Sequence, residues 1–199
     1  MRSIPRARLG GTGTAVIGRG ALVTRFSRRD VIHMRNKQKG FSLIELLIVV
    51  AIILIIAAIA IPNLIRSKMA ANEASAVASI RTVNTSEVIY SSTYAVAGVF
   101  SADLPSLGDG GTVGFCNTNT PTAAAACLID PALEKATTAA TLKSGYFFTY
   151  ANPAAGQYNI KGDPGTVNST GVRGFYSDQT LVIRAKNPGP GAGPTDAPI

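Results

Sequence analysis

The sequence predicts an α+β fold, in which one long N-terminal helix is followed by an antiparallel sheet of about four strands packed on the C-terminal half of that helix. Three observations predict it. Residues 41–61 form an almost unbroken apolar run, residues 63–97 contain no glycine or proline, and four strand-like segments follow residue 144. A meander of short strands has an apolar face that must be covered, and the long helix can cover it.

The positive charge of the chain is concentrated at its N-terminus. Residues 1–40 contain ten of the 19 lysines and arginines and a single acid, whereas residues 41–199 contain nine bases and ten acids. A net charge of +8 would favour a nucleic-acid or membrane-surface partner. Because the chain beyond residue 40 is nearly neutral, its charge predicts no nucleic-acid binding.

An apolar segment spans Phe41 to Ile61, and within its 21 residues only Ser42 and Glu45 are polar. As a helix it would be about 30 Å long, which matches the hydrocarbon core of a bilayer. Basic residues precede it, so the positive-inside rule favours a cytoplasmic N-terminus. Two other interpretations stay open: a buried helix of a soluble protein, and a secretory signal with its cleavage site at residues 58–60.

Glu45 is the feature that neither alternative explains. A carboxylate inside a membrane helix costs about 2.5–3.5 kcal/mol, so its presence indicates a function. The sequence has no lysine, arginine or histidine between Phe41 and Asn63, so we expect a positive charge to reach Glu45 from another chain or from a chain terminus. Cleavage before Phe41 would create an α-amino group on the same helical face. Such a charge pair would set the register between packed helices.

The stretch KGFSLIE at residues 39–45, the apolar helix after it and Pro62 closely resemble the class III signal of type IV pilins and related pseudopilins. The similarity implies that a prepilin peptidase cuts between Gly40 and Phe41, that Phe41 is then N-methylated, and that Glu45 acts in assembly. It implies a helix kink at Pro62. It also implies the pilin fold, in which a sheet packs on the C-terminal half of the long helix.

The resemblance also implies partners and a location. The expected partners are other pilin subunits in a homopolymer, the prepilin peptidase, the pilus or type II secretion assembly machinery of the inner membrane, and membrane lipid. The prepilin would cross the bacterial inner membrane once, with its N-terminus in the cytoplasm. The assembled subunit would lie in an extracellular pilus or a periplasmic pseudopilus.

Residues 1–40 are expected to be the leader that the peptidase removes. The segment MRNKQKG, residues 34–40, would be a complete leader by itself. We therefore expect translation to begin at Met34, so that residues 1–33 are an upstream extension that is not part of the protein. A genuinely long leader is the alternative.

Residues 62–98 are expected to continue the helix beyond the membrane as an amphipathic segment. Its stripe recurs at steps of three, four or seven residues and is apolar except for Glu87. The members of the stripe are Met69, Ala76, Ile80, Val83, Glu87, Tyr90 and Tyr94. With the membrane segment it would form one rod of about 80 Å, from Ser42 to about Ala97, ended by Gly98.

Residues 99–144 are rich in Gly, Pro, Thr and Asp and are predicted to form a connecting loop region, with a short helix at residues 131–140. Cys116 and Cys127 enclose ten of these residues. In an oxidising compartment this spacing favours a disulfide that closes the loop, and two buried free thiols are the alternative.

The sheet is predicted within residues 145–186. The strand-like segments are 145–152, 156–162, 172–178 and 180–186, separated by Gly and Pro clusters and, between the last two, by a turn at 177–179. Residues 187–199, with the sequence NPGPGAGPTDAPI, are expected to be a disordered tail.

The sequence predicts no catalytic, cofactor-binding or metal site. Beyond residue 40 it contains no histidine, so neither a Ser/His/Asp set nor a Cys/His set can be built, and two cysteines are too few for a structural zinc site. The acids beyond the helix lack calcium-loop spacing and are interpreted as solvated surface. They include Asp103, Asp109, Asp130, Glu134, Asp163 and Asp178.

The sequence therefore predicts a structural subunit of a type IV pilus-like filament and not an enzyme. A type II secretion pseudopilin, or a minor pilin, is the alternative within this class. From other classes, the alternatives are a membrane-tethered module that binds a ligand with residues 99–130 and a secreted enzyme released after Ala60. Glu45 discriminates between a filament subunit and a tethered module, because a mere anchor gains nothing from the carboxylate.

Overall fold

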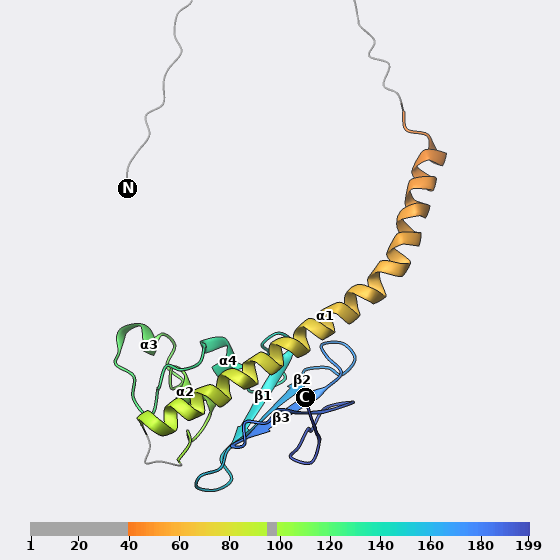
Figure 1. Cartoon of the computed structure of the whole chain (residues 1–199). Coiled ribbons are helices and arrows are strands. Elements are labelled where there is room, and N and C mark those ends of the chain that lie inside the picture. The colour runs from red at the N-terminus through yellow and green to blue at the C-terminus, as the bar shows by residue number, and fades with distance from the viewer. Residues whose placement is uncertain (1–39, 95–98) are drawn as a thin grey trace, which may run out of the picture. The chain divides into compact units, whose positions relative to one another are not determined.

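The computed structural model describes residues 40–94 and 99–199, and the expected leader up to residue 39 lies outside these residues. Helix α1, Leu43–Thr93, contains 51 residues. An antiparallel sheet follows it in the sequence, and α1 contacts the sheet through strands β1, β2 and β3. Figure 1 shows the C-terminal half of α1 lying along this sheet. The predicted α+β architecture, with a long helix packed on an antiparallel sheet, is thus confirmed.

Helix α1 continues through Pro62. A proline inside a helix removes one backbone hydrogen bond and distorts the helix locally, but here the helix continues on both sides of it. It ends at Thr93, four residues before the expected end, and the expected stop at Gly98 lies outside the described residues. Ser91 and Ser92 donate hydrogen bonds to the Val88 and Ile89 carbonyls, 3.0 and 2.8 Å away. These bonds satisfy carbonyl oxygens in the last turns and compete with further helix.

The sheet is a meander in the order β1-β2-β3-β4-β5, with every neighbouring pair antiparallel. Its strands are β1 (Tyr146–Ala151), β2 (Asn159–Pro164), β3 (Gly174–Asp178), β4 (Arg184–Lys186) and β5 (Ala197–Pro198). The first four fall within the four predicted segments, apart from the last two residues of β2. Alternation along the strands places one apolar face against α1.

The core lies between that face and α1. Ile80 and Val83 of the predicted stripe are fully buried in one cluster with Phe148, Ile160 and Phe175 from the sheet. Gly162 pairs with Phe148 on one side and Phe175 on the other. A Cβ at this glycine would lie 3.1 Å from the Phe148 ring and 3.3 Å from the Ile80 side chain. Glycine in the middle strand therefore allows α1 to approach the sheet closely.

The expectation of a disordered tail at residues 187–199 is wrong. Strand β5 pairs with β4 through Arg184 and Ala185, and Ala192 is buried. The tail is also held by two backbone hydrogen bonds, from the Gly189 amide to Val172 and from the Ile199 amide to Ile183. Its Pro/Gly composition indicates little secondary structure, but backbone hydrogen bonds to a neighbouring strand are sufficient to hold it.

The connecting region contains three short helices, α2 (Leu104–Leu107), α3 (Phe115–Thr118) and α4 (Pro131–Lys135). Asp103 caps α2 and Asp130 caps α4 by accepting hydrogen bonds from backbone amides in the first turn. The predicted helix at 131–140 is shorter than expected. It ends at Lys135 because the next carbonyl, that of Ala136, accepts the Phe148 amide of β1 at 2.6 Å instead of continuing the helix.

Candidate assembly surface

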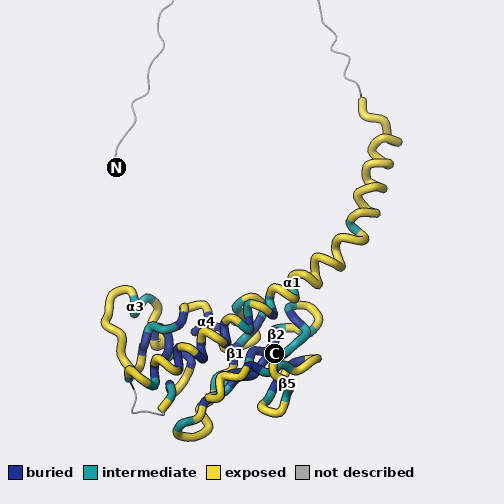
Figure 2. The backbone as a smooth tube through the Cα atoms, in the orientation of Figure 1, coloured by how far each residue is buried: buried dark blue, intermediate teal, exposed yellow. Residues whose placement is uncertain are grey.

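The first half of α1 is exposed over its whole circumference. No residue of α1 before Glu73 is buried, and Figure 2 shows this part of the helix almost entirely as exposed. Its large apolar side chains between residues 43 and 65 are each 45–79% exposed. Burial of one such side chain contributes about 1.5–3 kcal/mol of favourable free energy. Burial of the whole segment by lipid or by another protein would therefore contribute tens of kcal/mol. Among the described helices, α1 is long and apolar enough to cross a membrane.

Phe41 and Glu45 lie at the start of this exposed segment. Phe41 precedes α1 and is 75% exposed, and Glu45 is an exposed residue in the first turn of α1. A carboxylate in the first turn interacts favourably with the positive end of the helix dipole. This stabilises the helix start and gives Glu45 a local role beside the assembly role expected from the sequence. The sequence alone does not give this local role of Glu45, because the first turn is known only when the residue at which the helix begins is known.

Glu73 marks the point where α1 meets the head, which is the part of the protein built from residues 99–199, and it joins the helix to the loop before β3. It accepts hydrogen bonds from the Val172 and Arg173 amides at 2.9 and 3.1 Å and pairs with Arg173 Nε at 2.8 Å. Burial by itself would raise the pKa of Glu73, but the two amides and the guanidinium together lower it below its ordinary value. The carboxylate is therefore held charged by the loop that it anchors.

Glu87, the one polar member of the predicted stripe, is fully buried. Its carboxylate accepts hydrogen bonds from the Tyr150 hydroxyl, the Ser101 hydroxyl and the Ser101 amide. One turn earlier, Asn84 donates to the Ser177 hydroxyl at 2.8 Å and accepts from the Tyr158 hydroxyl at 3.0 Å. These two polar residues therefore fix the head to α1 at defined positions, in addition to the apolar packing.

The interpretation of the scattered acids as solvated surface is wrong for three of them, because Asp109, Glu134 and Asp163 are buried. Glu134 accepts the Asp109 and Gly111 amides, both at 2.8 Å, and Asp109 in turn accepts the Gly114 and Cys116 amides. Loop amides have no strand or helix partner, so a buried carboxylate satisfies them. The sequence gives no local signal for this, since the amides lie 23 to 25 residues from Glu134.

Cys116 and Cys127 form a disulfide in the structure, with their Cα atoms 5.6 Å apart. The bridge joins α3 to the segment before α4, and the Cys127 amide also bonds to the Gly108 carbonyl at 3.1 Å. The enclosed loop has few buried side chains of its own. The covalent link therefore replaces a core that this part of the head lacks.

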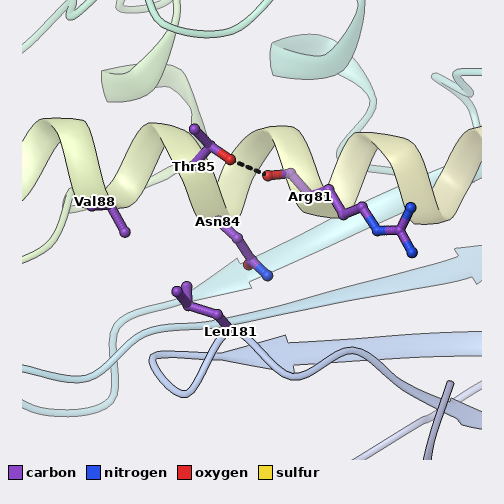
Figure 3. Close-up of a pocket in the computed structure, with 5 residues that line it drawn as sticks. All are labelled: Arg81, Asn84, Thr85, Val88 and Leu181. Atoms are coloured by element: carbon purple, nitrogen blue, oxygen red, sulfur yellow. Dashed lines mark hydrogen bonds between the residues drawn. The ribbon is translucent and has the colours of Figure 1, made fainter.

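A shallow groove of about 380 Å³ runs between α1 and the turn after β3. Figure 3 shows its lining residues, of which Leu181 comes from the turn and faces the helix. The Asn84 amide is already bonded to Ser177, and the Thr85 hydroxyl bonds to the Arg81 carbonyl. These two polar groups of the groove are therefore bonded within the protein. Within the described residues, no group of three or more His, Cys, Asp or Glu side chains is placed to hold a metal ion.

A long helix with an exposed apolar start and an antiparallel sheet on its second half define a pilin-like α+β protein. The profile of the prokaryotic N-terminal methylation motif matches residues 35–61, so the chain carries the N-terminal signal of the type IV pilin and pseudopilin family. The major component of the type IV wide pilus of Thermus thermophilus, PilA4, is 62% identical over 40 residues. That match covers 20% of this chain and 30% of the relative. No solved structure matches the chain significantly.

Proposed function

We propose that this protein is a structural subunit of a type IV pilus-like filament. One observation carries the proposal: the apolar segment is exposed around the whole helix and coincides with the methylation motif at residues 35–61. A bilayer covers such a surface before assembly, and the apolar helices of other subunits cover it afterwards. The similarity to a pilus component of Thermus thermophilus supports this proposal for the N-terminal part of the chain.

Processing is proposed to follow the motif. The prepilin peptidase cleaves after Gly40, and Phe41 becomes the N-methylated first residue. A Cβ placed on Gly40 would meet nothing within 4 Å in the structure, so packing does not require glycine there. Recognition by the peptidase is then the reason for the glycine. The leader that ends at Gly40 is thereby removed.

Assembly is proposed to use residues 41–61 as the filament core, while the head, built from residues 99–199 on the second half of α1, lies outside. Glu45 sets the axial register by pairing with the α-amino group of Phe41, in the same chain or in a neighbour. Pro62 weakens the helix at its own position and lets the apolar segment adjust its direction as subunits pack. The prepilin crosses the bacterial inner membrane once, with its N-terminus in the cytoplasm.

A pseudopilin of type II secretion, or a minor pilin, would use the same processing and the same helix, and is the alternative within the class. A membrane-tethered binding module would keep the helix in the bilayer and bind its ligand with residues 99–130. Four backbone amides of residues 109–116 are bonded to Glu134 and Asp109, which leaves this loop closed on itself. The filament proposal is therefore preferred.

The test is the intact mass and N-terminal sequence of the protein recovered from cells, followed by filament assembly of two variants. A chain that begins with N-methylated Phe41 supports the proposal. A chain that begins near Ile61 indicates a secretory signal, and a chain that retains Met34 indicates an uncleaved anchor. Among processed chains, Glu45→Ala is expected to stop or slow assembly, whereas Ser42→Ala, at the other polar position of the segment, is the matched control and should assemble. Equal assembly of both variants contradicts the role of Glu45.

A further inference from the structure

We propose that Arg66 and Lys68 form a site for the phosphate groups of anionic lipids at the membrane surface, just beyond the apolar part of α1. The proposal rests on the membrane-inserted stage of the proposed function and adds a specific partner to it. Arg66 and Lys68 are the first basic residues after the apolar run, and both are exposed.

The side chains of both residues can reach the lipid headgroups. The apolar run ends at Ile61, so at the helical rise per residue the two residues lie about 7.5 and 10.5 Å beyond it along the axis. The headgroup layer of one leaflet is about 5–8 Å thick. Side chains on a helix tilt towards its N-terminus, which here is the membrane side. Long basic side chains can therefore reach back to the phosphates.

Neither charge forms an ion pair with the described part of the protein. Within residues 40–94 and 99–199, the ion pairs are Lys143–Asp130 and Arg173–Glu73. Glu73, the first acid after Arg66 on the same helix, is held at 2.8 Å by Arg173 and is also bonded to two backbone amides. The two bases of α1 nearest to the membrane are thus available to an outside anion.

The arrangement around the helix favours lipid over an acidic protein surface. Two residues along a helix differ by about 200° in direction, so Arg66 and Lys68 project to opposite sides. A single flat partner can reach one of them, whereas headgroups surround the helix and can reach both. Leu64 and Ile65 between them and the apolar run are 70% and 47% exposed. Apolar side chains followed at once by basic side chains match the boundary between the acyl chains and the phosphates of a bilayer.

The experiment reconstitutes the processed, full-length chain into nanodiscs that contain equal amounts of phosphatidylglycerol and phosphatidylcholine with the same acyl chains. Lipids retained by the protein after gentle detergent release are counted by native mass spectrometry. The wild type is expected to enrich phosphatidylglycerol, by up to about fivefold for each base. The double variant Arg66→Gln/Lys68→Gln is expected to lose this enrichment, while Arg66→Lys retains it.

Arg81→Gln is the matched control, because Arg81 is an exposed base on the same helix, about 20 Å further from the membrane and beyond more than two Debye lengths. Equal retention of the two lipids by the wild type, unchanged enrichment in the double variant, or an equal loss in Arg81→Gln overturns the proposal. Co-elution of each chain with nanodiscs is measured in the same samples. A chain that fails to insert contradicts the membrane stage of the proposed function, whereas an inserted chain without lipid preference contradicts only the phosphate site.

Discussion

The Tyr150 hydroxyl donates a hydrogen bond of 2.6 Å to the Glu87 carboxylate and so ties β1 to α1. Burial raises the pKa of Tyr150 well above its ordinary value, and the bond to Glu87 raises it further. The phenol therefore stays protonated and remains a donor above the pH at which an ordinary tyrosine ionises. Because Ser101 also donates to Glu87, this one carboxylate holds both β1 and the segment before α2.

Replacement of Glu87 is expected to destabilise the head strongly. Glu87→Ala leaves the buried Ser101 amide without its acceptor. It also leaves the Ser101 and Tyr150 hydroxyls with only their longer bonds, to the Asp103 and Ser101 carbonyls at 3.2 and 3.1 Å. Each lost bond to the buried carboxylate costs about 1–3 kcal/mol. We expect the free energy of unfolding to fall by about 3 kcal/mol or more, and by about 1 kcal/mol for Tyr150→Phe, which removes one donor. Urea unfolding of the detergent-solubilised chain, followed by circular dichroism, measures both. A loss below about 0.5 kcal/mol for Glu87→Ala would show that the network is not a stability element.

Glu73 is expected to make stability sensitive to acid. Its pKa is lower in the folded protein than its ordinary value of 4.5, so the unfolded chain takes up a proton at a higher pH than the folded chain does. The stabilisation is complete above the ordinary pKa and is lost as the pH falls through the lower folded value. Melting temperatures measured from about pH 6 to about pH 3 should therefore fall less steeply for Glu73→Gln than for the wild type. Parallel curves would contradict this assignment.

Reduction of the Cys116–Cys127 disulfide is expected to loosen the connecting region and to leave the sheet folded. Closing a loop of about this size stabilises a protein by about 3 kcal/mol in the chain-entropy treatment. The double variant Cys116→Ser/Cys127→Ser should reproduce the effect of a reductant, and a reductant should not affect the variant. Hydrogen exchange is expected to increase in residues 109–127 and not in β1 to β3. Faster exchange throughout the sheet would contradict a local role.

Gly189 and Gly193 test the ordered tail. A Cβ on Gly189 would lie against the backbone of Gly174, whereas one on Gly193 would meet nothing within 4 Å. Gly189→Ala is therefore expected to lower the free energy of unfolding by about 1–3 kcal/mol, the usual cost of overpacking, and Gly193→Ala to change it little. Thermal unfolding of both variants measures the difference. Equal stabilities would indicate that the tail does not pack against β3 in solution.

Gly40 is expected to matter for processing and not for folding. Gly40→Leu places a side chain in open space, so the melting temperature of the head should be unchanged. The leader should nevertheless be retained, because the residue before the cleaved bond is altered. Intact mass and a melting curve on the same preparation separate the two effects. Normal removal of the leader from this variant would contradict cleavage after Gly40.

Much of the fold could be predicted because its signals are local. The apolar run, the absence of glycine and proline from residues 63–97 and the spacing of Ala76, Ile80 and Val83 define one long helix with one buried face. The four main strands were predictable from short apolar and aromatic segments between turn residues. Strand β5 was not, because two residues of a Pro/Gly-rich tail acquire strand geometry only by pairing with β4.

Those features that depend on near neighbours along the chain follow from the amino-acid sequence alone: the helix, its apolar first half, the position of Glu45 and the motif at residues 39–45. Which polar groups are buried depends on the packing of distant segments. Glu73 meets Arg173 across 100 residues, and Glu87 meets Tyr150 across 63. Whether a carboxylate is solvated or buried depends on the donors that the fold brings to it, and residues so far apart leave no periodic trace in the sequence.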